Sequence, residues 1–331
     1  MTTASVLLTV SNNWNSSTEK CEKEVLGRAA RSVAAVAARE LRETPATREQ
    51  ALRIMRDWLQ KNPDVANVRQ DESFLLRFLR QKKYSIPMAQ QTLLKYLNLR
   101  KYYRDCFTNL DCEDPQIKGI ISDGYIMISP VRDSKGRRVI IYNISKFDPG
   151  KYIWRDMCRA HVIVYESIAE DPVDQVCGVT HVGSGIGASG AHVMLWNPVD
   201  FARIIKWGEQ SLPMRHKEIH VVDMPAGIRY VVDFAISMTT PKMAERVKLH
   251  TNQKSMHSHV DPACLPDTYG GSIPTRDMIQ HTKQILSEQR KKLLSLDEME
   301  ILSTRGIVSS RGKTKLNTQD VEGSFRKLDI D

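Results

Sequence analysis

Basic side chains flank a single apolar segment in the second half of this 331-residue chain. Arg215 and Lys217 precede the segment, and Lys242 and Arg246 follow it. Arginine and lysine bind phosphate groups and anionic lipid surfaces through charge and hydrogen bonds. The formal net charge of +9 also favours an anionic partner: a phospholipid surface, a phosphorylated headgroup or nucleic acid. A solvated basic surface without a ligand is the alternative interpretation.

The segment between them, residues 226–238, is apolar on nearly every side and is predicted to be a helix. Only Arg229 and Asp233 interrupt its apolar stripes, and they lie one turn apart, where they can pair. Such a helix is either central to a core or has apolar material on both sides. Its basic flanks favour a helix that opens against an anionic membrane. We assign to this gate helix Ile228, Val231, Val232, Phe234, Ala235 and Met238.

A glycine-rich run, residues 185–190 (GIGASG), has the spacing of a dinucleotide-binding loop. In that fold the last glycine opens a helix whose N-terminus holds the pyrophosphate. Here Asn197-Pro198 soon follows and is typical of the start of a new helix, and no βαβ unit leads into the run. A flexible glycine loop is therefore favoured. A nicotinamide-dependent oxidoreductase stays an alternative that rests on this run alone.

Other catalytic and metal-binding patterns are weak in this sequence. His250, His257, His259 and Cys264 fit no common zinc spacing, and the six cysteines include no C-x-x-C pair. No Ser-His-Asp or paired-carboxylate motif is evident, and there is no aromatic platform for RNA. We therefore predict no catalytic residues, no metal, no cofactor other than a bound hydrophobic lipid, and no nucleic-acid partner.

The elements that position these residues fall into four parts. Residues 1–24 are polar and predicted to be disordered, and residues 25–104 have the periodicity of a small helical bundle. Strands alternate with helices over residues 115–280, which predicts an α/β fold with a mixed or parallel sheet covered by helices. Residues 281–331 read as a helix followed by a polar tail. No apolar run is long enough to span a bilayer and no signal peptide is recognised, so a cytoplasmic protein is expected.

Several segments, taken together, resemble the CRAL-TRIO family of lipid-binding proteins. The helical part contributes DESFLLRFLR (71–80) and QTLLKYLNLR (91–100). The later part contributes GRRVIIYNISKFDP, SLPMRHKEIHVVDMP, the gate helix and LPDTYGGSIP (265–274), in the order that the family has them. The resemblance covers residues 40–280 and is nearest to the branch of α-tocopherol transfer protein, clavesin and retinaldehyde-binding protein.

This resemblance implies an N-terminal helical bundle followed by an α/β sandwich. In the family, the sheet forms the floor of a closed hydrophobic pocket, and the gate helix covers that pocket. The resemblance also implies that basic residues beside the gate hold a phosphoinositide headgroup. Those positions fall on Lys82, Arg215, Lys217, Lys242 and Arg246, all of them basic in this chain.

The predicted pocket departs from the family in one segment. Where the family has an Asp-x-x-Gly run with aromatic residues, this chain has Ser184, Ala188 and Ser189, so no relative's ligand is transferred to it. His161 and Tyr165 lie one turn apart in a predicted helix, either as core side chains or as polar contacts to a lipid hydroxyl or carbonyl. The residues assigned to the lipid pocket are Cys158, His161, Tyr165, Ala188, Ser189, Trp196, Ile204, Trp207, Leu212, Met214 and Ile219.

The sequence therefore favours a non-enzymatic, monomeric carrier that binds one hydrophobic lipid, similar to tocopherol or a retinoid. We expect it to exchange this lipid at phosphoinositide-containing membranes, with which it associates peripherally. Its partners are then the lipid, a phosphoinositide headgroup and an anionic membrane surface. A phosphoinositide-binding trafficking adaptor, in which the bound lipid is structural, is the alternative.

Overall fold

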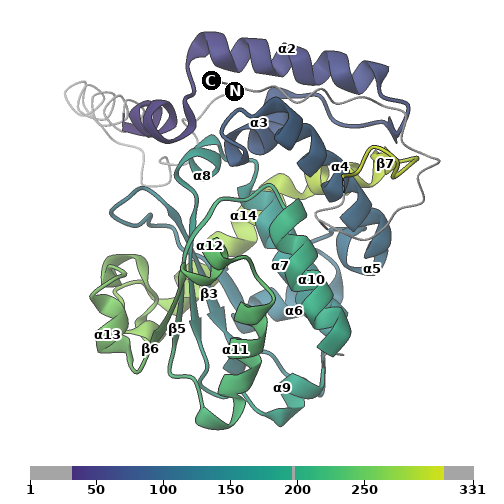
Figure 1. Ribbon diagram of the computed structural model, residues 1–331. Helices are drawn as coiled ribbons and strands as arrows, with labels where there is room; N and C mark the ends of the chain where they lie inside the picture. Colours follow the sequence, from purple (N-terminus) through teal and green to yellow (C-terminus); the bar gives the residue numbers. More distant parts are fainter. Residues whose placement is uncertain (1–31, 196–197, 309–331) are drawn as a thin grey trace, which may run out of the picture.

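The computed structural model describes residues 32–195 and 198–308, and a helical bundle lies at one end of a helix-covered sheet (Figure 1). The bundle contains α2 (Pro45–Lys61), α3 (Glu72–Gln81) and α4 (Ile86–Tyr102). Its core is aromatic: Phe78 and Tyr96 are fully buried, and their rings meet edge to face with centroids 5.5 Å apart. Aromatic pairs in this geometry stabilise a core beyond the area that they bury.

Side-chain caps fix where the helices of the bundle begin. The hydroxyl of Thr44 accepts a hydrogen bond from the backbone N–H of Thr47 at 3.1 Å, and Pro45 occupies the first turn of α2. The sequence of residues 47–50 predicts a capping box at Thr47, and this prediction is wrong. Pro45 is already helical because the fixed φ of proline suits the first turn, so the cap lies three residues earlier.

A five-stranded sheet forms the centre of the second part, and it confirms the predicted α/β fold. The strand order is β2 (Ile126–Ile128), β3 (Arg138–Asn143), β4 (Val179–Ser184), β5 (His216–Val222) and β6 (Val247–His250). Strand β2 is antiparallel to β3, and the other neighbours are parallel. Parallel strands are normally covered on both faces.

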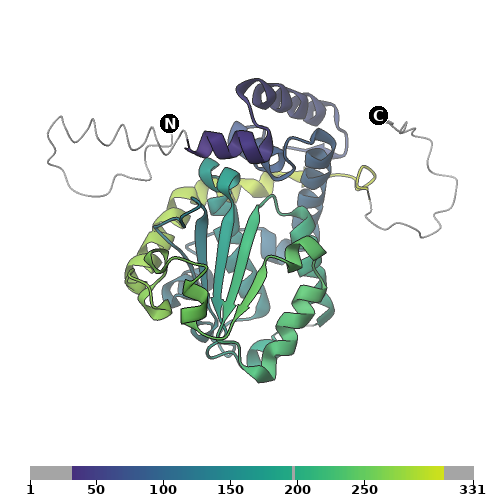
Figure 2. The same ribbon diagram turned by 60° about the vertical axis from the view of Figure 1, so that its left-hand side comes forward.

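Helices cover both faces of this sheet, as Figures 1 and 2 show. On one face lie α7 (Trp154–Ile168), α10 (Pro198–Ser211) and α11 (Arg229–Ser237). On the other lie α13 (Gln253–His257) and the first part of α14 (Thr275–Ser295). No helix in the described residues is long and apolar enough to cross a membrane.

The remaining elements are short. They are η1 (Ala37–Leu41), β1 (Val65–Ala66), α5 (Arg104–Phe107), α6 (Pro115–Asp123), η2 (Ile144–Lys146), α8 (Pro172–Cys177), α9 (Gly190–Met194), η3 (Ala226–Ile228), α12 (Pro241–Ala244), η4 (Pro262–Cys264), η5 (Asp267–Tyr269), η6 (Leu296–Glu298) and β7 (Glu300–Ile301). Strand β7 pairs with β1 in an antiparallel two-stranded sheet, which ties the segment after α14 to the bundle.

Buried ion pairs join the bundle to α7, which packs on the sheet. Arg77 of α3 is 1% exposed, and its Nη1 donates to Glu166 of α7 at 2.6 Å. Glu170 accepts from Arg69 at 2.8 Å and from Arg77 at 3.3 Å. Removing one partner of such a pair leaves an uncompensated buried charge, which costs about 3–5 kcal/mol. These contacts fix the end of α3, and with it Lys82, relative to the sheet.

Candidate functional site

A cavity of about 590 Å³ brings together all five basic residues predicted to hold a headgroup. We call it the basic pocket. Its lining comes from the helix around η1, the turn after α3, α10, the start of β5 and α12. The lining residues are Arg39, Glu40, Gln81, Lys82, Lys83, Glu209, Met214, Arg215, His216, Lys217, Lys242, Met243 and Arg246. Cations therefore clearly outnumber carboxylates in this pocket, which favours an anion there.

A tight turn after α3 presents two of these lysines. Lys83 and Tyr84 both have left-handed backbone conformations, with φ of 51° and 63°. Such conformations are unfavourable for residues other than glycine and persist only where the surroundings hold them. Here the backbone N–H of Tyr84 donates to the carbonyl of Leu79 at 2.8 Å, which closes the turn.

The cations of the basic pocket differ in their partners. Arg215 and Lys217 both bond to Glu40, at 2.8 and 2.6 Å. In the described part of the chain, Lys82 and Lys242 make no ion pair within 4.0 Å. The Nη1 of Arg246 donates to a backbone carbonyl, that of His216.

Burial and the charges of neighbouring side chains shift the pKa values of several groups in the basic pocket. Burial lowers the pKa of Lys82, and the charge of Lys95 lowers it further. Burial likewise lowers the pKa of Arg246, with a second contribution from Arg215. For Glu40, burial alone raises the pKa, but the hydrogen bonds from Lys217 and Arg215 outweigh it and bring the pKa down to about 2. A bound anion relieves this repulsion among the cations.

A chain of hydrogen bonds runs from the protein core to the basic pocket. The hydroxyl of Tyr125 lies 2.8 Å from Nε2 of His161, whose Nδ1 lies 3.2 Å from the hydroxyl of Tyr165. The Tyr165 hydroxyl lies 2.8 Å from that of Tyr142, which lies 2.7 Å from Nδ1 of His181. Strands and helix α7 thus bring together polar groups that are far apart in the sequence.

The last link of this chain joins His181 to His216, with Nε2 and Nδ1 2.8 Å apart. His216 lines the basic pocket. Burial lowers the pKa of His161 to about 4, and burial together with the charge of Arg246 does the same for His216. Both imidazoles are therefore neutral at pH 7, where each can donate one hydrogen bond and accept another.

The sheet face under α10 and α11 carries apolar side chains that are not fully covered. On β5, Val222 and His220 are fully buried on the α13 side, whereas Ile219 and Val221 on the other side are half-buried. On β6, Val247 and Leu249 pair with them in register and are also half-buried. Strand β5 is internal to the sheet, and an internal parallel strand normally buries both faces. Ile219 and Val221, with Val247 and Leu249 beside them on the edge strand, therefore face a region that the protein fills only in part.

The two helices on this side show the same pattern. No residue of α11 is buried, although most of its side chains are apolar. The described part of α10 before Ser211 also has no buried residue. The two helices touch through Phe201 and Phe234, whose rings stack with centroids 6.4 Å apart. We call the apolar surfaces of α10, α11, β5 and β6 on this side the loose face.

The predicted gate residues all lie in η3, α11 or directly after it. Ile228, Val231, Val232 and Ala235 are half-buried. Phe234 is 37% exposed. Met238 follows α11 and is half-buried. A gate that moves requires few tight contacts, and the helix has that property; its movement stays a prediction.

The predicted lipid-pocket residues do not all lie together. Ile219 belongs to the loose face, and His161 and Tyr165 belong to the hydrogen-bonded chain beside it. Ile204, Leu212 and Met214 are half-buried and pack against the main core. Trp196 lies outside the described residues.

Three other predicted pocket residues lie elsewhere, and the fourth, Ala188, lies in the glycine loop. Cys158 is buried in the core beside Cys106. Ser189 is exposed, and its hydroxyl lies 2.9 Å from Nδ1 of His192. Trp207 faces the bundle, where its ring meets those of Tyr102 and Tyr103 at 4.9 and 6.0 Å. Ala188 is half-buried in the glycine loop before α9.

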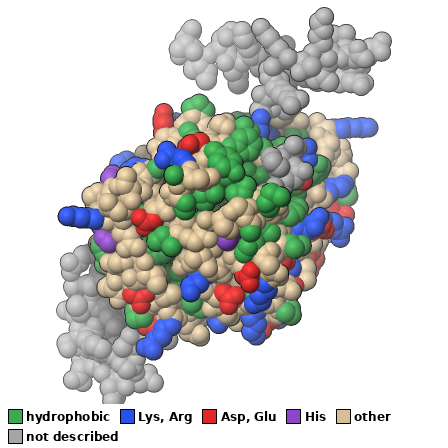
Figure 3. All heavy atoms as spheres, turned by 90° about the horizontal axis from the view of Figure 1, so that it is seen from below, with side chains coloured by type: hydrophobic (Ala, Val, Ile, Leu, Met, Phe, Trp, Pro, Cys, Tyr) green, Lys and Arg blue, Asp and Glu red, His purple; other side chains and the backbone are tan. Residues whose placement is uncertain are grey.

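Large apolar side chains are also exposed at the end of the molecule that carries α9 and α11. They include Ile186 of the glycine loop, Met194 of α9 and Tyr230 of α11, which are 54%, 84% and 62% exposed. Seen from below, hydrophobic side chains gather into a patch (Figure 3). Contiguous exposed apolar surface of this kind favours contact with a partner or a membrane.

Sequence reasoning missed Glu40 and the strand members of the hydrogen-bonded chain. Nothing in the sequence around Glu40 marks it as a site residue, because its partner Arg215 lies 175 residues further along the chain. Tyr142 and His181 did carry a signal, because each is a polar side chain on the same side of its strand as a buried apolar residue, Ile140 on β3 and Val179 on β4. Such a position calls for a hydrogen-bond partner.

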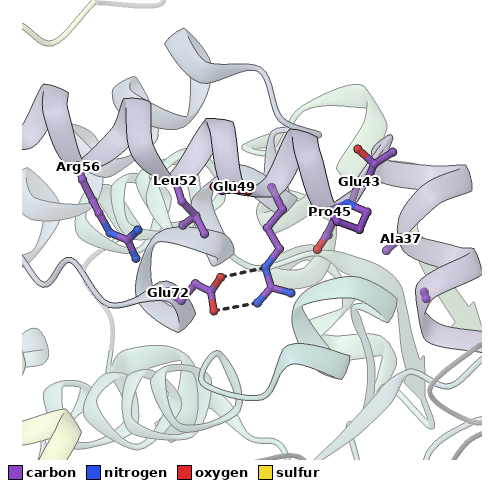
Figure 4. A pocket seen from close by; sticks show the side chains of 10 residues that line it. Ala37, Glu43, Pro45, Glu49, Leu52, Arg56 and Glu72 are labelled. Atoms are coloured by element: carbon purple, nitrogen blue, oxygen red, sulfur yellow. Dashed lines mark hydrogen bonds and ion pairs between the residues drawn. The ribbon is translucent and has the colours of Figure 1, made fainter.

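A second groove, of about 390 Å³, lies between α2 and the helix before it. Its lining contains both arginines and glutamates, and Arg48 and Glu72 pair across it at 2.9 Å (Figure 4). None of the predicted site residues lines this groove. We assign no ligand to it.

Two other sequence motifs are the GIGASG run and the candidate zinc ligands. The GIGASG run leads into α9, which is only five residues long, Gly190–Met194. A dinucleotide loop needs a longer helix that points its N-terminus at the pyrophosphate. Among the described residues, no group of three or more His, Cys, Asp or Glu side chains is arranged to hold a metal ion.

Comparison with known proteins identifies the family. The model of the CRAL/TRIO domain matches residues 122–271, and that of the Pinta-like UBA domain matches residues 44–117. Clavesin-1 of Xenopus laevis is 30% identical over 240 residues, which are 72% of this chain and 72% of that protein. Clavesin-2 of Homo sapiens is 29% identical over 251 residues, 76% of this chain and 77% of that protein. A structure titled "Crystal structure of Sfh5" is 11% identical with a TM-score of 0.49, covering 76% of this chain and 98% of that one.

The chain belongs to the CRAL-TRIO family of lipid-binding proteins, and within it to the clavesin branch. This confirms the resemblance seen in the sequence.

Proposed function

We propose that this protein is a non-enzymatic carrier, which binds one hydrophobic lipid between the sheet and helices α10 and α11. It exchanges this lipid at membranes that contain phosphoinositides. The observation that carries the proposal is the loose face: four elements turn apolar side chains towards one another without burying them. An apolar ligand supplies the contacts that the protein's own side chains do not make.

The hydrogen-bonded chain supports a ligand with few polar atoms. The side chains of His161 and Tyr165 are only half-buried. Desolvation nevertheless lowers the pKa of His161 to about 4. This combination suits a side chain that faces a space inside the protein rather than bulk water. In the proposal, the Tyr165 hydroxyl contacts the hydroxyl or carbonyl group of a ligand similar to tocopherol or a retinoid. His161 positions that hydroxyl, because its two ring nitrogens are bonded to Tyr125 and Tyr165.

Release of such a ligand requires a second input. Burying a lipid stabilises the complex by about 0.8 kcal/mol per methylene, but a membrane offers the lipid nearly the same free energy. Near an anionic membrane each basic side chain contributes about 1 kcal/mol. The five predicted headgroup residues together thus supply roughly 5 kcal/mol of attraction to the membrane. This attraction shifts the gate equilibrium towards the open form because, in the proposal, the open form binds the membrane more strongly.

A charge reversal on the pocket rim tests this role. Lys242 is exposed on α12, and Lys242→Glu is expected to slow transfer to phosphoinositide vesicles about tenfold while cargo binding stays intact. The matched control is Lys254→Glu, which makes the same change on α13, on the opposite face of the sheet. Transfer that slows equally in both variants would contradict a headgroup site in the basic pocket.

The alternative is a phosphoinositide-binding adaptor for membrane trafficking, in which the bound lipid is structural. The exposed apolar patch with Met194 and Tyr230 suits membrane contact in either case. The two functions separate in a vesicle assay, because an adaptor binds the membrane without speeding the movement of hydrophobic ligand between vesicles. In both, we propose a monomer in the cytoplasm that associates with membranes peripherally.

A further inference from the structure

The basic pocket contains two carboxylates, and they are held in different ways. Glu209 of α10 accepts a hydrogen bond from the backbone N–H of Thr240 at 2.9 Å and another from the hydroxyl of the same residue. Glu40 instead bonds directly to pocket cations, with its Oε2 2.8 Å from Nη2 of Arg215 and 2.6 Å from Nζ of Lys217. Glu40 therefore takes the position in which a phosphate oxygen of a ligand would bind these two side chains.

A small apolar cluster holds Glu40 in place. Ala37 and Leu41 of η1 are buried against Val176 and Cys177 of α8, apart from the main core. The η1 helix ends at Arg42, whose φ of 62° is left-handed. This cluster is small and separate from the main core, so a ligand that competes for Arg215 and Lys217 can displace the Glu40 carboxylate without disrupting the main core.

The rest of the pocket is free of such a competitor. Lys82, Lys83 and Lys242 form no ion pair within 4.0 Å among the residues that the structure describes. The pocket therefore has an open half, formed by these lysines, and an occupied half, formed by Arg215 and Lys217 with Glu40 between them.

We propose that Glu40 is a specificity-determining residue, which limits how strongly the basic pocket prefers doubly over singly phosphorylated ligands. This inference rests on the proposed function, since it concerns the same anion site. A ligand with one phosphomonoester binds the open half and leaves Glu40 in place. A second phosphomonoester binds Arg215 and Lys217 only when Glu40 is displaced. The apparent affinity for the doubly phosphorylated ligand is therefore its intrinsic affinity multiplied by the fraction of molecules in which the Glu40 carboxylate has left.

The test compares wild type with Glu40→Gln on vesicles that contain an inositol lipid with either one or two phosphomonoesters, at equal total charge. The variant is expected to bind the doubly phosphorylated vesicles about five- to tenfold more tightly. Binding to the singly phosphorylated vesicles is expected to change less than twofold. An equal gain on both, or no gain, would overturn the proposal.

Glu209→Gln is the matched control, because it removes the other carboxylate of the same pocket without uncovering Arg215 and Lys217. It is expected to tighten binding to both kinds of vesicle, and to favour the doubly phosphorylated kind less than Glu40→Gln does. Soluble inositol phosphates with one and two phosphomonoesters are measured in parallel. The same selective gain with soluble ligands supports a site that binds the phosphates themselves. A gain confined to vesicles assigns the effect to the bilayer and overturns the proposal.

Hydrogen exchange on the unmodified protein provides a second test that needs no variant. Because binding and displacement are linked, the doubly phosphorylated ligand is expected to speed amide exchange in residues 37–41, and the singly phosphorylated ligand is not. Unchanged exchange with both ligands would contradict displacement.

Failure of this inference is distinct from failure of the proposed function. If wild type binds phosphoinositide vesicles and Lys242→Glu abolishes the binding, but Glu40→Gln has no effect, only the role of Glu40 is wrong. If wild type binds these vesicles no better than neutral ones, the headgroup site itself is wrong, and the inference falls with it.

Discussion

Two halves of one sheet face are packed very differently. A row of side chains crosses the sheet through Ile140, His181, Ile219 and Val247, which are paired in register from β3 to β6. Ile140 is 0% exposed and His181 is 5% exposed, in the half that packs with α7. Ile219 and Val247 are only half-buried, in the half that faces α10 and α11. The difference lies in what covers the strands, because β5 fully buries His220 and Val222 on its other face.

The covering helices explain this difference. Most of α7 is buried, and its side chains interlock with those of the sheet and of α5 and α6 in one continuous core. Helix α11 is at least as apolar but buries none of its residues. Apolar composition without burial is unfavourable in water, by about 25 cal/mol for each Å² left exposed. A bound lipid removes that cost, which makes the packed half a scaffold and the loose half a binding surface.

The largest expected effect compares the same substitution in the two halves. Ile140→Ala leaves a cavity in packed surroundings and is expected to lower the free energy of unfolding by about 4 kcal/mol. Ile219→Ala, on the same face, is expected to lower it by about 1 kcal/mol in lipid-free protein, because few contacts are lost. Urea unfolding measures both. Equal losses would show that the two halves are packed alike.

The next effect concerns pH, since the hydrogen-bonded chain lies along the boundary between the halves. The pKa of His161 and of His216 is about 4 in the folded protein, against 6.5 for an ordinary histidine. The unfolded chain therefore takes up protons first, and stability present above pH 6.5 is lost as the pH falls towards 4. We expect a loss on the order of a few kcal/mol.

Thermal unfolding between pH 7 and pH 4 checks this expectation. The carboxyls of Glu40 and Glu218 have pKa values of about 2, so their contribution is lost only below pH 4.5 and separates from that of the histidines. A melting temperature that stays constant down to pH 4.5 would mean that these imidazoles are not held neutral.

Filling the loose half provides a third comparison. Val221→Trp adds a large side chain where we expect space, so it should weaken cargo binding at least tenfold with little loss of stability. Val179→Trp adds the same side chain in the packed half, where overpacking costs about 1–3 kcal/mol or more. Competition with a fluorescent hydrophobic probe, together with thermal melting, measures both quantities. A strongly destabilised Val221→Trp would indicate that the loose half is already full.

The smallest expected effect concerns single hydroxyl groups. Tyr165→Phe removes the hydroxyl nearest to the proposed ligand and is expected to weaken cargo binding about fivefold, or about 1 kcal/mol. Tyr125→Phe removes a hydroxyl from the buried end of the same chain, 2.8 Å from His161. It is expected to cost similar stability but to leave cargo affinity unchanged. Equal effects on affinity would mean that Tyr165 has no direct contact with the ligand.

Local and patterned features of the fold were predictable from the sequence. The alternation of strands and helices gives the α/β fold, and the resemblance to the family gives all five cations that meet in the basic pocket. The start of α2 was mispredicted because Thr44 and Pro45 compete with a plausible cap at Thr47.

Contacts between distant segments were not predictable in this way. The bond between Glu40 and Lys217 joins residues 177 positions apart, and nothing in the local sequence of either marks the pairing. The chain from Tyr142 through His181 to His216 needs three neighbouring strands in a known register. The orientation of Trp207 towards Tyr102 likewise depends on how the bundle packs against α10.

Native mass spectrometry of the protein purified without added ligand tests the central claim most directly. The account predicts a single adduct of lipid mass on each chain, which organic solvent extracts and which Val221→Trp lacks. A bare chain in both proteins, with no uptake of any hydrophobic ligand offered afterwards, would contradict it.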